Sequence, residues 1–225
     1  MNVSVKPVFE AILFDLDGTL VDTAPDLVAA ANRLLLAHGK KALPYEELRP
    51  RASAGARGLI AGGFGITPEQ AEYIPLRDEF FQYYESHICV DSVLFNGMEE
   101  LLHHFEKASI PWGIVTNKME RFTNPLMQLM GLNHRACVIV SGDTTAHAKP
   151  HPEPLLHAAR LAGIDPSKTL YVGDDHRDII AGREAGMKTV TALYGYLGSI
   201  EPAHAWGADY EIQEPLDLLK IVFPK

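Results

Sequence analysis

Two pairs of acidic residues stand directly after short apolar runs and are the first candidates for chemistry. Asp15 and Asp17 follow residues 9–14, and Asp174 and Asp178 follow a second run. An apolar run with turn-forming residues behind it predicts a buried strand, so both pairs are expected at strand ends. Carboxylates at such places serve as general acids and bases or as ligands of hard cations.

Uncharged polar residues and a lysine follow two other apolar runs. Thr116 and Asn117 come after residues 112–115, and Lys149 comes a few residues after the run 137–140. Ligands of parallel α/β sheets bind beyond the carboxyl ends of the strands. If the four runs are neighbouring parallel strands, then carboxylate, hydroxyl, amide and ammonium groups meet at one edge of the sheet.

Helical and strand-like segments alternate through the second half of the chain. This alternation predicts βαβ units, and therefore an α/β, Rossmann-like core with a parallel sheet flanked by helices. The expected helices are 98–107, 124–130, 154–162 and 178–185, and the expected strands after 9–14 are 112–115, 137–140, 169–172 and 188–192, with 208–212 as an additional strand.

The segment between the first strand and the alternating region has a different pattern. Residues 44–88 show helical spacing with glycine breaks and contain no strand pattern, which indicates a small all-helical insert. A helix over 27–36 precedes it, and Thr23 and Asp26 resemble a capping box at its start.

Composition limits the classes of partner. The chain has 225 residues and a net charge of −9, which argues against broad binding to nucleic acid because phosphates attract a basic face. No apolar run approaches the ~18 residues that span a bilayer, and no signal pattern opens the chain. Cys89 and Cys137 form no metal site or disulfide framework. They are expected to be buried thiols, with one disulfide between them as the alternative. We therefore expect a cytoplasmic protein with no membrane partner.

Four segments together resemble the motifs of the haloacid dehalogenase superfamily, in its phosphatase branch. They occur in the family's order, each after an expected strand, and the resemblance covers nearly the whole chain. It implies a core formed by residues 1–22 and 94–225, with residues 23–93 as the helical cap of the family. The four segments are Asp15 to Thr19, Thr116, Lys149, and Gly173 to Asp178.

The resemblance implies phosphoryl transfer through an aspartyl-phosphate. Asp15 would be the nucleophile, and Asp17 would act as the general acid and then the general base. Mg²⁺ would be the cofactor, held by the side chains of Asp15 and Asp174 and by the backbone carbonyl of Asp17. The extra acid Asp175 is a second candidate for approach to the metal.

The remaining motif residues would hold the phosphoryl group. Thr116, Asn117 and Lys149 are expected to contact its oxygens, and the lysine adds positive charge where the transition state is negative. Asp178 would not contact the phosphoryl group itself but would orient either Lys149 or the ligands of the metal.

The expected cap contains a candidate specificity loop. Ser53, Gly55 and Arg57 lie in a small-residue segment whose backbone amides can approach a ligand. Arg57 is a candidate partner for a substrate carboxylate. The partner of the protein would thus be a small-molecule phosphomonoester, and the chain would act as a monomer or a homodimer.

Several activities share this pattern. It resembles bacterial phosphoglycolate phosphatases, and it is also similar to N-acetylmuramic acid 6-phosphate phosphatases of peptidoglycan recycling. Asp17 argues for a phosphatase over a dehalogenase, because a departing halide needs no proton. Gly173 favours hydrolysis over a sugar phosphomutase, whose motif there often contains Glu. A non-catalytic binding protein is disfavoured because Asp15 and Asp17 are both present.

Overall fold

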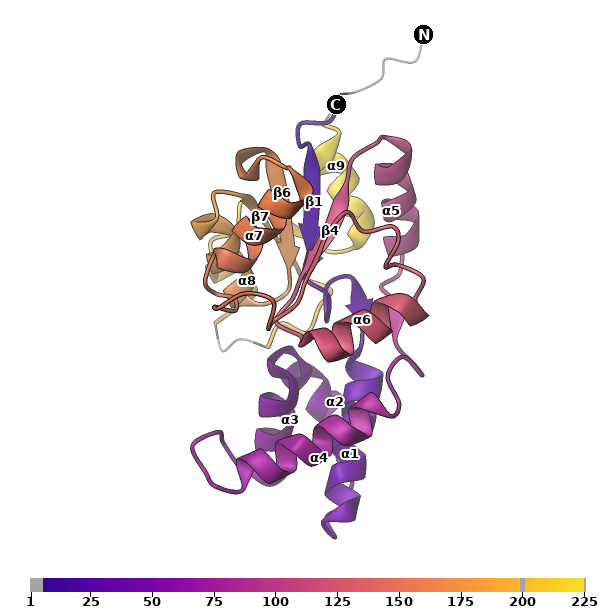
Figure 1. Cartoon of the computed structure of the whole chain (residues 1–225), viewed down its shortest axis with the longest axis vertical. Coiled ribbons are helices and arrows are strands. Elements are labelled where there is room, and N and C mark those ends of the chain that lie inside the picture. Colours follow the sequence, from indigo (N-terminus) through magenta and orange to yellow (C-terminus); the bar gives the residue numbers. More distant parts are fainter. Residues whose placement is uncertain (1–5, 199–200, 225) are drawn as a thin grey trace.

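The centre of the molecule is a six-stranded parallel sheet (Figure 1). The computed structural model describes residues 6–198 and 201–224. The strand order is β5-β4-β1-β6-β7-β8, so the strands that carry the acidic pairs are neighbours at the centre. The predicted α/β fold class is confirmed. The strands are β1 (Ala11–Phe14), β4 (Trp112–Val115), β5 (Ile139–Val140), β6 (Thr169–Gly173), β7 (Lys188–Ala192) and β8 (Tyr210–Ile212).

Helices cover both faces of this sheet. Because strand side chains alternate, Ile12 and Phe14 of β1 pack on one face, where α5 contributes to the same core. Leu13 packs on the opposite face with α7 and α8. The central strands are therefore apolar throughout, as expected for a sheet buried on both sides. The helices are α5 (Met98–Lys107), α6 (Glu120–Leu129), α7 (Glu153–Ala162), α8 (His176–Glu184) and α9 (Leu218–Val222).

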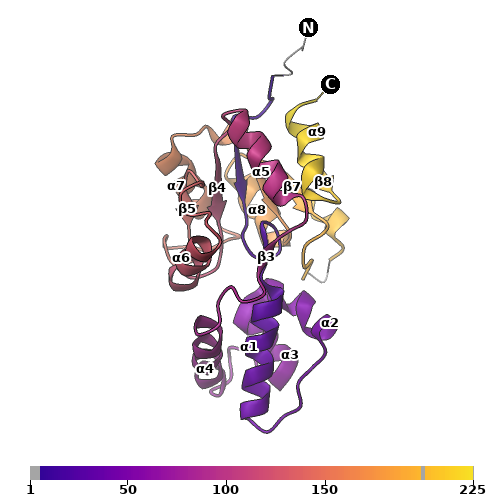
Figure 2. The ribbon, with the colours of Figure 1, turned by 90° about the vertical axis from the view of Figure 1, so that its right-hand side faces the viewer.

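A separate group of helices lies beyond the carboxyl ends of the strands, opposite the chain termini (Figures 1 and 2). It has its own apolar core, in which Phe80 and Tyr84 are fully buried. The predicted helical insert thus forms. Its members are α1 (Ala24–Ala37), α2 (Tyr45–Leu48), a 3₁₀ segment (Arg49–Ala54), α3 (Gly55–Phe64) and α4 (Tyr73–Glu85).

A two-stranded antiparallel sheet joins the two parts of the molecule. It consists of β2 (Val21–Asp22) and β3 (Val93–Leu94). The sequence pattern missed it, because two residues per strand show no period. The division of the chain at 22/23 and 93/94 stays a prediction, and this sheet lies at both proposed crossing points.

The expected capping box at the start of α1 is wrong. The Thr23 hydroxyl donates to the carboxylate of Asp17 instead of closing the helix end. Asp26 accepts hydrogen bonds from the backbone amides of Val90, Asp91 and Ser92, at 3.0 Å each. Both side chains are used in tertiary contacts, which local spacing does not report.

Two smaller expectations also need correction. The helix expected from residue 124 begins at Glu120, and Pro125 lies inside it. Asp143 receives the backbone amide of Glu120, which stabilises the earlier start. Cys89 and Cys137 are free thiols, but neither is fully buried as expected: Cys89 is half-buried and Cys137 is exposed. Within residues 6–198 and 201–224, every helix is too short or too polar to cross a membrane.

Asp26 holds residues 90–92, the segment through which the chain leaves the helical group and returns to the core. Its carboxylate is buried and also accepts the Ser92 hydroxyl at 2.6 Å. Asp26→Ala leaves these donors without an acceptor and is expected to lower the free energy of unfolding by about 3 kcal/mol. Asp78→Ala, at an exposed carboxylate paired with Arg77, is the control, with a loss below about 0.5 kcal/mol. Equal midpoints for the two variants in urea denaturation would contradict this role.

Candidate active site

Asp15 and Asp17 lie at the carboxyl end of β1, where the chain turns toward the helical group. The turn requires Gly18, whose φ is +85°. A Cβ atom at Gly18 would overlap the carboxylate of Asp174, so the two loops approach each other as closely as backbone allows. The Thr19 hydroxyl then donates to Asp174 at 2.9 Å, which ties the loop after β1 to the loop after β6.

Three carboxylates and one lysine converge at this edge of the sheet. Oxygens of Asp15, Asp174 and Asp178 all lie within 4.8 Å of one another, a spacing suited to a metal ion. The ammonium of Lys149 is 2.8 Å from Asp15 and 2.7 Å from Asp178. It also donates to the carbonyl of Val115 at 3.1 Å. Three acids thus face one buried cation, and the group has an excess of negative charge.

That excess appears in the pKa values. Burial, together with the charge of Asp178, raises the pKa of Asp15 to about 6 even though Lys149 opposes the shift. Burial and the charges of Asp15 and Asp178 raise the pKa of Asp174 well above its usual value. For Lys149, burial lowers the pKa, but Asp15 and Asp178 outweigh burial, so the ammonium form is favoured.

Thr116 and Asn117 come to the same edge from β4. Thr116 is buried and lines a pocket in front of Asp15, where its hydroxyl accepts the backbone amide of Lys118 at 3.1 Å. The Asn117 side chain donates to the Lys149 carbonyl and accepts the Lys149 amide, both at 2.9 Å. Its amide therefore holds the backbone of Lys149, in addition to lining the pocket.

Asp175 is not part of the cluster of Asp15, Asp174 and Asp178, contrary to one expectation. Its carboxylate caps α8 and forms an ion pair with Arg177 at 2.8 Å. Ser53 donates to the same carboxylate at 2.6 Å, and Arg177 donates to the Ser53 carbonyl at 2.9 Å. Burial raises the pKa of Asp175, but the opposite effects of Arg177 and Ser53 together are larger. The pKa is therefore below its usual value, and the carboxylate stays ionised. Asp175 therefore links the helical group to the core.

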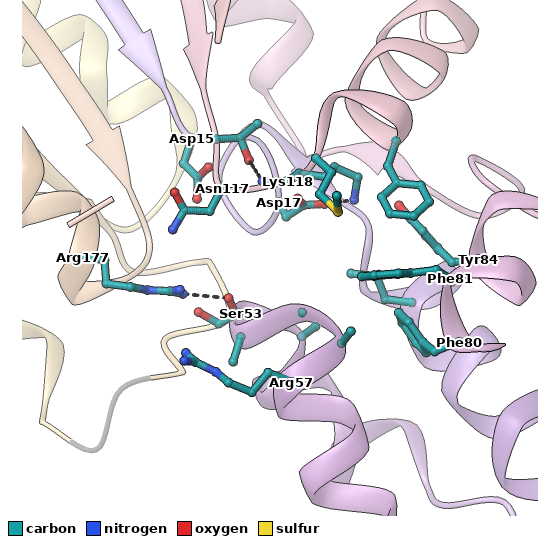
Figure 3. A pocket seen from close by; sticks show the side chains of 18 of the residues that line it. Asp15, Asp17, Ser53, Arg57, Phe80, Phe81, Tyr84, Asn117, Lys118 and Arg177 are labelled. Carbon is teal, nitrogen blue, oxygen red and sulfur yellow. Dashed lines mark hydrogen bonds and ion pairs between the residues drawn. The ribbon is translucent and has the colours of Figure 1, made fainter. Parts of the chain in front are cut away.

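A pocket of about 280 Å³ lies between the core and the helical group (Figure 3). The predicted cap residues Ser53, Gly55 and Arg57 line it together with Asp15 and Asp17. Arg57 and Arg177 lie on one side of the pocket, and the rings of Phe80, Phe81 and Tyr84 lie on the other. The structure thus brings the core and cap candidates together around one cavity with a cationic side and an aromatic side.

Lys118 is a site residue to which the sequence pattern assigned no role. Its side chain is only 6% exposed, and its ammonium lies 2.9 Å from the Asp17 carboxylate. Burial lowers the pKa of Lys118, but the effects of Asp17 and Tyr84 together outweigh burial and raise the pKa, so the side chain remains a cation. The sequence feature that could have indicated Lys118 is its place directly after Thr116 and Asn117, at a strand end. Tyr196 was also missed, although its backbone amide donates to Asp174 at 2.7 Å.

Comparison with known proteins agrees with this geometry. A family model described as haloacid dehalogenase-like hydrolase matches residues 12–192. The chain belongs to the haloacid dehalogenase-like hydrolases. This hydrolase is 45% identical to N-acetylmuramic acid 6-phosphate phosphatase of Pseudomonas aeruginosa, over 95% of this chain and 94% of the relative. It is 43% identical to phosphoglycolate phosphatase of Xanthomonas campestris, over 92% and 94% of the two chains.

Solved structures support the same assignment. The hydrolase is similar to a crystal structure described as a predicted phosphoglycolate phosphatase from Haemophilus somnus, with a TM-score of 0.83. The two sequences are 29% identical, and the match covers 95% of this chain and 97% of that one. The expected family, with its α/β core and helical insert, is confirmed.

The close approach of Gly18 to Asp174 leads to a prediction about cation binding. Gly18→Ala introduces a Cβ that displaces Asp174, so a divalent cation should raise the melting temperature of this variant much less than that of the wild type. Gly39→Ala is the matched control, because Gly39 also has a positive φ but has no atom within 4 Å of the added Cβ. It should cost about 1 kcal/mol and keep the full response to the cation. The same response in both variants would mean that Asp174 binds no cation.

The raised pKa of Asp15 predicts how stability depends on pH in metal-free protein. Because the pKa is about 6 in the folded state against 3.8 for a free carboxyl, the unfolded chain loses its proton first. Stability therefore falls as pH rises from about 4 to about 6. Asp15→Asn should stabilise the protein above pH 7 by about 3 kcal/mol, and much less at pH 4. Urea denaturation in EDTA at both pH values measures this, and a pH-independent difference would rule out the assigned cause.

Proposed function

We propose that this hydrolase is a Mg²⁺-dependent phosphatase that cleaves small carboxylated phosphomonoesters through an aspartyl-phosphate at Asp15. The observation that carries the proposal is the position of Asp15. It lines the pocket together with Arg57, and it also contacts the buried Lys149 and lies close to the carboxylates of Asp174 and Asp178. An anionic ester can enter past Arg57 and Arg177 and meet the nucleophile at the bottom.

The first step transfers the phosphoryl group to the enzyme. An oxygen of Asp15 attacks phosphorus, the ester P–O bond breaks, and its electron pair stays on the leaving oxygen. That oxygen takes a proton from the Asp17 carboxyl and departs as an alcohol. Lys149 and Thr116 stabilise the negative charge on the phosphoryl oxygens during the transfer.

The second step returns the enzyme to its starting state. Water attacks phosphorus and gives a proton to the Asp17 carboxylate, and the bond between phosphorus and Asp15 breaks. Inorganic phosphate leaves, Asp15 is again a carboxylate and Asp17 again carries a proton. One water is consumed for each ester.

The donor set fits Mg²⁺, which prefers carboxylate and carbonyl oxygens. The side chains of Asp15 and Asp174 and the carbonyl of Asp17 would hold the ion. The ion would neutralise charge between nucleophile and phosphate. Asp178 already binds Lys149 through one oxygen and accepts the Asp175 amide with the other at 3.1 Å, so it orients the lysine.

Two carboxylated phosphomonoesters are candidate substrates. Phosphoglycolate is the first, and the aromatic side of the pocket supports the larger N-acetylmuramate 6-phosphate as the second. Phosphoglycolate satisfies the cationic side but leaves the rings of Phe80, Phe81 and Tyr84 uncovered. N-acetylmuramate 6-phosphate carries the same two anionic groups and adds a sugar ring and two methyl groups, which can pack on these rings. The similarity to a phosphatase of that name in Pseudomonas aeruginosa supports this second candidate.

The test is phosphate release from 2-phosphoglycolate and N-acetylmuramate 6-phosphate in parallel with Mg²⁺. A kcat/KM at least a hundredfold higher for one ester, about 2.7 kcal/mol in transition-state binding, identifies the substrate. Asp15→Asn should abolish release from both, and Phe81→Ala should reduce the sugar ester more than phosphoglycolate. No Mg²⁺-dependent release from either ester or from an aryl phosphate would refute the phosphatase.

A further inference from the structure

The two oxygens of Asp17 have different surroundings. Oδ1 accepts the Lys118 ammonium at 2.9 Å and the Thr23 hydroxyl. Oδ2 receives no hydrogen bond from the described residues. Two donors on one oxygen fix both the position and the rotation of the carboxyl plane, and the other oxygen is left for a ligand.

Lys118 is itself held from two sides. Its backbone amide donates to Thr116, which places it at the end of β4. Its ammonium lies 4.6 Å from the centre of the Tyr84 ring, which belongs to α4 in the helical group. In Figure 3, Lys118 lies beside Asp17 and extends toward Tyr84. Desolvated contact between a cation and an aromatic face is favourable and keeps the ammonium in place.

We propose that Lys118 is a positioning residue that holds Asp17 Oδ1, so that Oδ2 carries the proton to the leaving oxygen. Thr23 supports the same orientation from the start of α1. Lys118 takes no proton and forms no bond to the ester in this role. The inference rests on the proposed phosphatase activity. It adds that Lys118 sets the orientation of the Asp17 carboxyl.

The role predicts a dependence on the leaving group. An alkoxide needs a proton as its bond to phosphorus breaks, whereas p-nitrophenolate is a stable anion that departs without one. Loss of Lys118 should therefore impair alkyl esters far more than p-nitrophenyl phosphate. A site that merely lost its fold or its phosphate contacts would lose both esters alike.

The experiment compares kcat/KM for p-nitrophenyl phosphate and for the better alkyl ester, in wild type and Lys118→Met. This quantity reports steps up to departure of the alcohol, so the later hydrolysis of the aspartyl-phosphate does not enter. We expect a loss of about 100-fold for the alkyl ester, the usual size of a displaced general acid, and a loss below about fivefold for the aryl ester. Lys168→Met is the matched control, since Lys168 is exposed and lies before β6, at the opposite end of the strand from the site.

A second pair of variants decides the matter if Lys118→Met does not fold. Thr23→Val removes the other donor to Oδ1 while keeping the side-chain shape, and should show the same selective loss. Thr23→Ser keeps the hydroxyl and should keep the wild-type ratio of the two esters. An unchanged alkyl-to-aryl ratio in Lys118→Met, or in Thr23→Val where the first does not fold, overturns the inference. Absence of activity toward both esters in the wild type would instead refute the phosphatase itself.

Discussion

The charge balance at the carboxyl ends of β1 and β6 governs the rest of this molecule. Three carboxylates, Asp15, Asp174 and Asp178, lie close together with the ammonium of Lys149, which contacts Asp15 and Asp178, in a site with little solvent. Burial of unequal charge is unfavourable, and the raised pKa values of Asp15 and Asp174 express that cost. The surrounding fold must therefore hold these groups together against their repulsion, and a divalent cation would complete the balance.

The backbone supplies that restraint at a few points. Glycine at positions 18 and 195 lets the loops after β1 and β7 come into contact with Asp174, where a side chain would collide. The Asn117 side chain forms two hydrogen bonds with the backbone of Lys149, so β4 sets the position of the lysine. Each tie joins segments that are distant along the chain, and together they hold the acids close to one another.

The helical group is tied to this edge by polar contacts and an aromatic contact. Ser53 reaches Asp175, and Tyr84 lies against Lys118. Tyr196 extends the connection, because its backbone amide donates to Asp174 while its hydroxyl accepts the amides of Thr23 and Ala24 at 2.8 Å each. The start of α1 and Asp174 are thereby held by one residue. The pocket and the cluster of acids are thus parts of one connected arrangement.

The sequence by itself determined the family, the alternation of strands and helices, and the core motif residues. Asp15 and Asp174 directly follow β1 and β6, and a parallel sheet necessarily brings such positions to one edge. Local pattern was sufficient there because burial of a strand on both faces leaves a continuous apolar run that is visible in the residue order.

Only the tertiary structure decided how the remaining side chains are used. Thr23 and Asp26 have the spacing of a helix cap, but they bind Asp17 and the segment 90–92. Asp175 has the charge of a metal ligand, but it binds Arg177 and Ser53. Lys118 binds Asp17, about a hundred residues earlier in the chain. A side chain's partner depends on the direction in which the folded backbone points it and on distant segments, and neither is encoded in local spacing.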